Sequence, residues 1–150
     1  NIQRAGRADD QIQIEDVETI RIGQSFQIIN IGDFCNECGN CSTFCPTSGE
    51  PYRVKPKFYL TPEGFKDEAF GYMLKDEVLR ARVDGEEETL LRREYHLIYE
   101  TKDVEARLNP KTFAVEEITF SSDAPDTIEL RHAARMCVLL TALRDFYLFK

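Results

Sequence analysis

The chain contains, at residues 33–46, the run Asp33-Phe34-Cys35-Asn36-Glu37-Cys38-Gly39-Asn40-Cys41-Ser42-Thr43-Phe44-Cys45-Pro46, which holds four of its five cysteines. These cysteines follow the pattern Cys-x2-Cys-x2-Cys-x3-Cys-Pro, the spacing of the bacterial iron–sulfur run. Gaps of two residues let a loop curl so that several thiolates point at one small object, and Gly39 supplies the positive φ that such a loop needs. The run therefore predicts a [4Fe-4S] site with Cys35, Cys38, Cys41 and Cys45 as ligands.

The assignment of the fourth ligand stays open. In two-cluster ferredoxins the last cysteine of such a run binds the other cluster. Cys35, Cys38 and Cys41 would then hold one cluster, and Cys45 would cap a second cluster that a cysteine run upstream of this sequence completes. The first residue is not an initiator Met, which we interpret as the start of a piece of a longer protein. In the alternative, one cluster uses all four local cysteines, or takes Cys137 as a remote ligand.

Composition limits the class of protein. At 150 residues, 42% of them hydrophobic and 31% charged, the chain has the composition of a soluble globular protein with a moderate core. A net charge of −8 gives no support for binding to nucleic acid. The sequence has no apolar run long enough for a membrane span and no signal-peptide pattern at its start. We predict a cytoplasmic protein with no membrane partner, whose cysteines stay reduced and available to metal.

Periodicity predicts mostly short strands in the first part of the chain. Residues 1–10 are polar and without period, so we expect an extended linker there. Alternating apolar residues at 11–22 and the apolar run at 26–31 predict strands, the second leading into the cysteine run. Thr61 followed by Pro62 predicts a short helix, with Thr61 as its N-cap.

The second part predicts a sheet and a helix. Residues 70–120 have the pattern of an antiparallel meander, with Asp84-Gly85 as a hairpin turn that the following glutamates lengthen into a loop or bulge. Residues 126–149 predict a C-terminal helix whose apolar stripe contains Cys137, here favoured as a buried side chain. The predicted fold class is α+β: a ferredoxin-like cysteine loop segment, then an antiparallel β meander and a C-terminal helix. We expect residues 1–60 to form the iron–sulfur segment and residues 61–150 the meander and helix, packed with it as one unit.

Other candidate functional residues are few. Residues 52–60 combine basic and aromatic side chains that can balance the charge of a cluster and shield it from water, or equally protect an edge strand. His96 and His132 are far apart in the sequence, so we interpret both as structural. No glycine-rich phosphate loop or catalytic constellation is evident. The cofactor would carry the chemistry, and the protein would position it and set its potential.

The segments Gly32–Cys41, Thr43–Tyr52 and Lys55–Leu60 resemble the C-terminal iron–sulfur region of the selenate reductase subunit family, large iron–sulfur flavoproteins similar to the small subunit of glutamate synthase. The resemblance is dense over residues 26–60 and looser beyond. It implies a multidomain oxidoreductase in which upstream domains bind FAD and NAD(P)H and clusters pass single electrons onward. It matches the four cysteines at 35–45 to the family's cluster run and places no flavin or nicotinamide residue on this chain.

Together these patterns predict an electron-transfer module that binds a [4Fe-4S] cluster within a larger NAD(P)H/FAD-dependent oxidoreductase, with no catalytic site of its own. Its expected partners are the upstream flavin domain of the same protein and another oxidoreductase subunit. The alternatives are a zinc-stabilised domain and a non-redox structural or interaction domain. Structural zinc usually takes two well-separated cysteine pairs, so the tight run favours iron.

Overall fold

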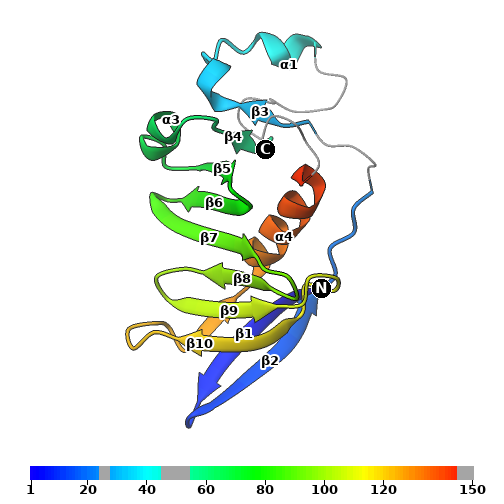
Figure 1. Cartoon of the computed structure of the whole chain (residues 1–150), viewed down its shortest axis with the longest axis vertical. Helices are drawn as coiled ribbons and strands as arrows, with labels where there is room; N and C mark the ends of the chain where they lie inside the picture. Colours follow the sequence, from blue (N-terminus) through cyan, green and yellow to red (C-terminus); the bar gives the residue numbers. More distant parts are fainter. Residues whose placement is uncertain (24–27, 45–54, 145–150) are drawn as a thin grey trace.

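The computed structural model describes residues 1–23, 28–44 and 55–144 (Figure 1). Within these ranges the chain forms an eight-stranded sheet in the order β10-β9-β8-β7-β6-β5-β4-β3 and a three-stranded sheet in the order β11-β1-β2. The elements are β1 (Ile2–Ala8), β2 (Gln11–Glu18), β3 (Asn30–Ile31), η1 (Gly32–Phe34), α1 (Asn40–Phe44), β4 (Lys57–Phe58), α3 (Pro62–Lys66), β5 (Gly71–Lys75), β6 (Val78–Val83), β7 (Glu86–Arg92), β8 (Leu97–Glu100), β9 (Val104–Leu108), β10 (Val115–Phe120), β11 (Thr127–Glu129) and α4 (Arg131–Leu143).

The predicted α+β fold class is wrong. The structure is mostly β, with 43% strand against 19% helix, and the described residues show no ferredoxin-like arrangement of the cysteine loop. The strand that leads into the cysteine run, β3, is instead the edge of the same sheet that contains the meander. The prediction failed because cysteine spacing constrains where ligands lie along a loop, while the pairing of the flanking strands depends on distant residues.

The prediction of a linker at residues 1–10 is also wrong, because residues 2–8 form strand β1. β1 pairs with β2 on one side and with β11 on the other, so it is the central strand of the small sheet. Polar side chains of β1 make cross-strand contacts. Arg4 forms an ion pair with Glu15 of β2 at 3.1 Å and a longer one with Glu129 of β11 at 3.8 Å. Only Ile2 and Ala5 of β1 are buried. Cross-strand charge pairs of this kind contribute modestly and fix the partners of a strand.

The predicted antiparallel meander is present as β5 to β10, each strand pairing with the next. The β6–β7 turn is tighter than predicted, because Val83 pairs directly with Glu86. Asp84 and Gly85 both have positive φ, at 52° and 80°, which is the two-residue type I′ geometry favoured by Asp-Gly. The glutamates after Gly85 therefore lie in strand β7 and not in a lengthened loop.

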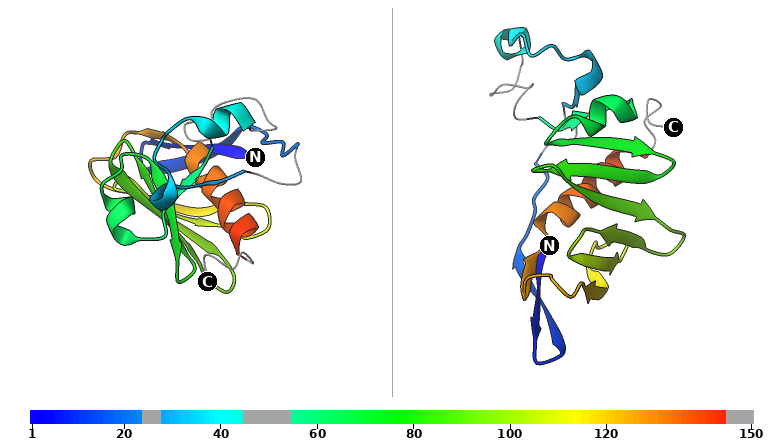
Figure 2. Two further views of the ribbon diagram at one scale, coloured as in Figure 1. Left: turned by 90° about the horizontal axis from the view of Figure 1, so that it is seen from above. Right: turned by 90° about the vertical axis from the view of Figure 1, so that its left-hand side faces the viewer.

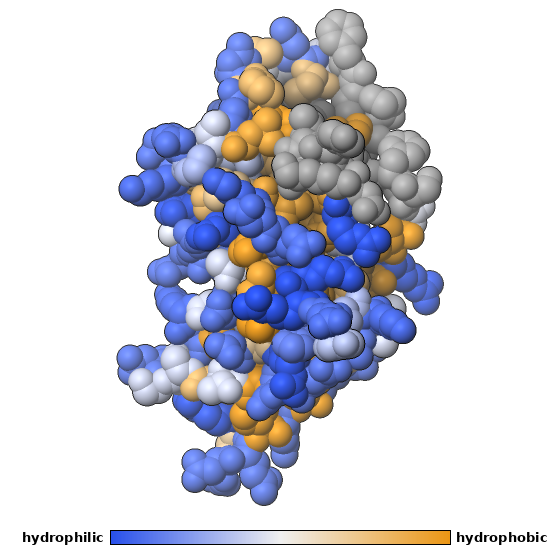
Figure 3. All heavy atoms as spheres, in the orientation of Figure 1, coloured by the Kyte–Doolittle hydropathy of each residue, from blue (hydrophilic) through white to orange (hydrophobic). Residues whose placement is uncertain are grey.

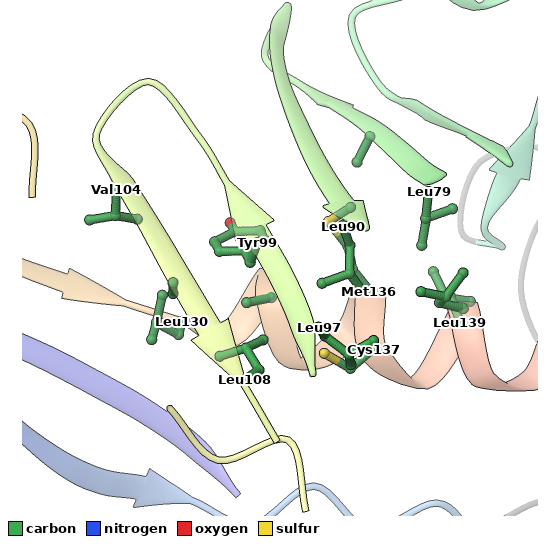
Figure 4. Packing of buried hydrophobic residues seen from close by; sticks show 14 of the residues in the cluster. Leu79, Leu90, Leu97, Tyr99, Val104, Leu108, Leu130, Met136, Cys137 and Leu139 are labelled. Carbon is green, nitrogen blue, oxygen red and sulfur yellow. The ribbon is translucent and has the colours of Figure 1, made fainter. Parts of the chain in front are cut away.

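Helix α4 lies against one face of the large sheet and closes its core (Figures 1 and 2). Met136 and Cys137 on the helix are fully buried against sheet residues that include Leu79, Leu90 and Leu97 (Figure 4). The helix begins later than predicted, because residues 127–129 pair with β1 as strand β11. Its buried face is the apolar stripe that the sequence indicated.

At the other end of the large sheet, two pairs of strands run parallel. β3 pairs in parallel with β4, and β4 pairs in parallel with β5, so each pair needs a crossover connection. The second crossover contains helix α3, where the Thr61 hydroxyl accepts a hydrogen bond from the Gly64 amide at 3.2 Å, as the predicted N-cap. The first crossover contains the cysteine run, and its described part projects beyond the sheet (Figure 2).

Candidate metal centre

The described part of the cysteine run begins at the carboxyl end of β3. The chain turns through η1, and the Cys35 amide donates to the Gly32 carbonyl at 3.1 Å. It then turns again at Gly39, which has the predicted positive φ, at 78°, and continues into α1 with Cys41 in its first turn. Cys38 lies between these two turns. Cys45, the fourth predicted ligand, lies outside the described residues.

The three described cysteines of the run are free thiols at the surface of one hollow. Cys35 is half-buried, and Cys38 and Cys41 are exposed. All three line a hollow of about 380 Å³, together with residues 28–31 and Phe34 of η1. The structure therefore brings the thiols of Cys35, Cys38 and Cys41 to the same open space.

The described cysteines do not form a complete ligand cage. Among the residues that the structure describes, no group of three His, Cys, Asp or Glu side chains is arranged to hold a metal ion. The donors have the right chemistry, since iron–sulfur clusters are held by cysteine thiolates. Cys35, Cys38 and Cys41 therefore fit a cluster by ligand type and by lining the same hollow, whereas a closed cage would need further ligands and a tighter curl of the loop.

Asp33 attaches the start of the cysteine segment, the described residues 33–44 of the cysteine run, to the sheet. Its carboxylate accepts a hydrogen bond from the Leu60 amide at 2.6 Å and another from the Thr61 hydroxyl. Burial acts to raise the pKa of Asp33, but these hydrogen bonds outweigh it and lower the pKa below its usual value. Because Asp33 follows β3 and Leu60 follows β4, the contact joins the carboxyl ends of the two parallel strands.

A second attachment comes from the predicted basic patch. Lys57 of β4 donates to the Glu37 carboxylate in the cysteine segment at 3.0 Å. Burial opposes the charge on Lys57, but the hydrogen bond to Glu37 and the interactions with Tyr59 together outweigh it and raise the lysine pKa above its usual value. The neighbouring aromatic residues Phe58 and Tyr59 are buried in the core beneath the segment. Of the other predicted members, Tyr52 and Arg53 lie outside the described residues, and Lys55 lies within them.

Sequence reasoning missed one residue at this site. Asn30, in strand β3, donates a hydrogen bond from its side-chain amide nitrogen to the Cys35 sulfur at 3.4 Å. An asparagine five residues before a cysteine carries no recognised motif. The contact arises because η1 folds Cys35 back towards the end of β3, which only the backbone path reveals.

A separate polar cluster joins α4 to the sheet. His132 Nδ1 contacts the Glu88 carboxylate, and His132 Nε2 lies 3.1 Å from the Tyr72 hydroxyl. The Tyr99 hydroxyl donates to the same Glu88 carboxylate at 2.9 Å. Burial raises the pKa of both Tyr72 and Tyr99, so both remain protonated near neutral pH. These contacts position the first turn of α4 on the sheet.

Cys137, the remote ligand in one alternative, is fully buried in the core between α4 and the sheet (Figure 4). Burial raises the pKa of its thiol to about 12. A pKa this far above the ordinary value of a thiol disfavours the thiolate, which is the ligating form, and Cys137 does not line the hollow that Cys35, Cys38 and Cys41 share. Cys137 is therefore a core side chain in this structure.

Comparison with known proteins gives a partial match. The chain is 34% identical over 62 residues to the protein named "Putative oxidoreductase YgfK" from Escherichia coli strain K12, and equally to the protein of that name from Escherichia coli O157:H7. The matched stretch covers 41% of this chain and only 6% of each relative's length. No family model matches the chain, and no solved structure matches it significantly. Among the described residues, no helix combines the length and apolar character needed to cross a membrane.

Proposed function

We propose that this chain is an electron-transfer module of a larger NAD(P)H/FAD-dependent oxidoreductase, in which Cys35, Cys38, Cys41 and Cys45 bind [4Fe-4S] clusters. The observation that carries the proposal is the Cys-x2-Cys-x2-Cys-x3-Cys-Pro spacing, together with the position of its three described cysteines around one hollow. When bound, the cluster supplies one-electron transfer. The protein supplies the thiolates and attaches the segment that carries them to the sheet. The proposed cytoplasmic location keeps these thiols reduced.

Two further observations support this function. The partial relatives are named as oxidoreductases, and the family that the cysteine run resembles combines flavin domains with iron–sulfur clusters. The cysteine segment is also attached to the sheet at both Asp33 and Glu37, although it projects beyond the sheet. Two such contacts limit how far this segment can move relative to the sheet. The donor in this proposal is an upstream flavin domain, and an upstream cysteine run completes a second cluster.

The test is the metal content of the full-length protein purified without oxygen. We expect iron and acid-labile sulfide with a brown colour that dithionite bleaches. Serine substitutions at Cys35, Cys38 and Cys41 should each lower the iron content and the visible absorbance severalfold, because each removes a thiolate ligand. Cys137→Ala is the matched control: it removes the buried cysteine and should leave the iron content unchanged.

The same preparation separates the alternative functions. Zinc in place of iron would identify a zinc-stabilised domain and overturn the proposal. Iron that NADPH and NADH both fail to reduce in the intact protein would assign the cluster a structural role. Unchanged iron content in all three serine variants would remove the cysteine run from the site altogether.

A further inference from the structure

The side chain of Asn30 is aimed at a proposed cluster ligand by a fixed backbone. Asn30 pairs with Lys57 in the parallel β3–β4 ladder, and the backbone N–H of Asn30 donates to the Pro56 carbonyl at 2.9 Å. Asn30 is half-buried, and the nitrogen of its side-chain amide, Nδ2, lies 3.4 Å from the Cys35 sulfur. The strand therefore holds a neutral N–H donor against one thiol of the cysteine segment.

We propose that Asn30 is a positioning residue of the electron-transfer site, whose side-chain N–H bonds the Cys35 thiolate and raises the reduction potential of the cluster that this thiolate ligates. The inference rests on the proposed function, since it needs a cluster on Cys35. It goes beyond that function because it assigns the tuning of the potential to a residue outside the cysteine run.

The direction of the effect follows from charge. Reduction adds one electron, so the cluster with its thiolates becomes more negative, and a hydrogen-bond donor stabilises the reduced form more than the oxidised form. Hydrogen bonds to the sulfurs are among the factors that set the potentials of such clusters. Because Asn30 is uncharged and partly buried, its dipole acts at close range with little screening by salt. Removing the donor should therefore make the cluster harder to reduce.

The experiment compares Asn30→Leu and Asn30→Asp with wild type in the full-length protein. Leucine keeps the size of asparagine without the donor, and aspartate keeps the shape while adding a negative charge. We expect the reduction equilibrium to shift about tenfold towards the oxidised form for Asn30→Leu, equal to about 59 mV for one electron, and further for Asn30→Asp. The potential is measured by redox titration followed by electron paramagnetic resonance, with iron content measured in parallel.

Gln13→Leu is the control, since Gln13 is an exposed amide side chain in β2, outside the cysteine run. This variant should change the reduction equilibrium of the cluster by less than about twofold relative to wild type. Wild-type iron content with an unchanged potential in both Asn30 variants would overturn this inference and leave the proposed function standing. Loss of iron from both folded Asn30 variants would overturn it too, by making Asn30 a requirement for holding the cluster. Wild-type protein without iron would refute the proposed function itself.

Discussion

At the scale of single residues, the base of the cysteine segment is packed around Tyr59. The ring of Tyr59 lies between Gly32 and Gly71, and a Cβ placed on Gly32 would come within 2.3 Å of it. A Cβ on Gly71 would come within 2.6 Å of the same ring. Tyr59 is only 3% exposed, so its ring has no free space to move into. Gly32 therefore permits close packing exactly where the chain leaves β3 for the first cysteine.

We predict that Gly32→Ala destabilises the protein by about 1–3 kcal/mol, because overpacking a filled site forces backbone or ring to shift. The free energy of unfolding is measured by denaturant titration of the purified chain. Gly23→Ala is the control, since Gly23 has no atom within 4 Å of the position of an added Cβ. It should change stability by less than about 0.5 kcal/mol. An equal effect of both substitutions would show that the packing around Tyr59 does not limit this site.

Part of the site at this scale was predictable. The positive φ of Gly39 and the N-cap at Thr61 follow from local chemistry, and both predictions are confirmed. The contact of Asn30 with Cys35 and the attachment of Asp33 to Leu60 were not predictable. The first depends on how η1 folds Cys35 back towards β3. The second depends on β4 lying beside β3, although the two strands are more than twenty residues apart in the sequence.

At the scale of elements, the start of α4 is set by tertiary pairing and not by the local capping pattern. The spacing of Asp126 and Glu129 is that of a capping box, which favours a helix that begins near residue 126. Residues 127–129 instead complete β1 as its second neighbour, with Ala5 opposite Ile128, and the helix begins at Arg131. The edge of β1 offers backbone hydrogen bonds and a partner for Arg4, which outweigh a cap that is worth only about 1 kcal/mol.

We predict that Met136→Ala in α4 destabilises the protein by about 2–5 kcal/mol. Met136 is fully buried in the core between the helix and the sheet, so truncation leaves a cavity that its neighbours fill only in part. The measurement is again the free energy of unfolding by denaturant. Thr141→Ala, on the exposed side of the same helix, should change it by less than about 0.5 kcal/mol. A small effect at Met136 would mean that α4 does not close this core.

At the scale of the whole molecule, β1 at the start of the chain pairs with β11, the strand that directly precedes α4, in one small sheet. The cysteine segment lies at the opposite end of the large sheet from β10 and projects from it (Figures 1 and 2). The face seen in Figure 3 is largely hydrophilic, in agreement with the net charge of −8. The β framework thus carries the candidate metal centre at one end.

We predict that residues 1–150 alone, reconstituted anaerobically with iron and sulfide, retain less iron per cysteine run than the full-length protein. The reason is the proposed sharing of ligands between Cys45 and an upstream cysteine run. Iron and sulfide analysis after gel filtration measures the difference. A stable, complete [4Fe-4S] cluster in the isolated chain would contradict the shared-ligand scheme and favour a cluster held by the four local cysteines.

The sequence by itself determined the features that depend on neighbours along the chain: the cysteine spacing, the Asp84-Gly85 turn, the cap at Thr61 and the apolar stripe of α4. Only the tertiary structure decided that residues 2–8 are a central strand, that β3 and β4 run parallel, and that Asp33 accepts a hydrogen bond from the Leu60 amide. The physical reason is that turns, caps and helical stripes are fixed by interactions within a few residues. Strand partners are chosen by hydrogen bonds and charge pairs between segments that the sequence alone does not place side by side.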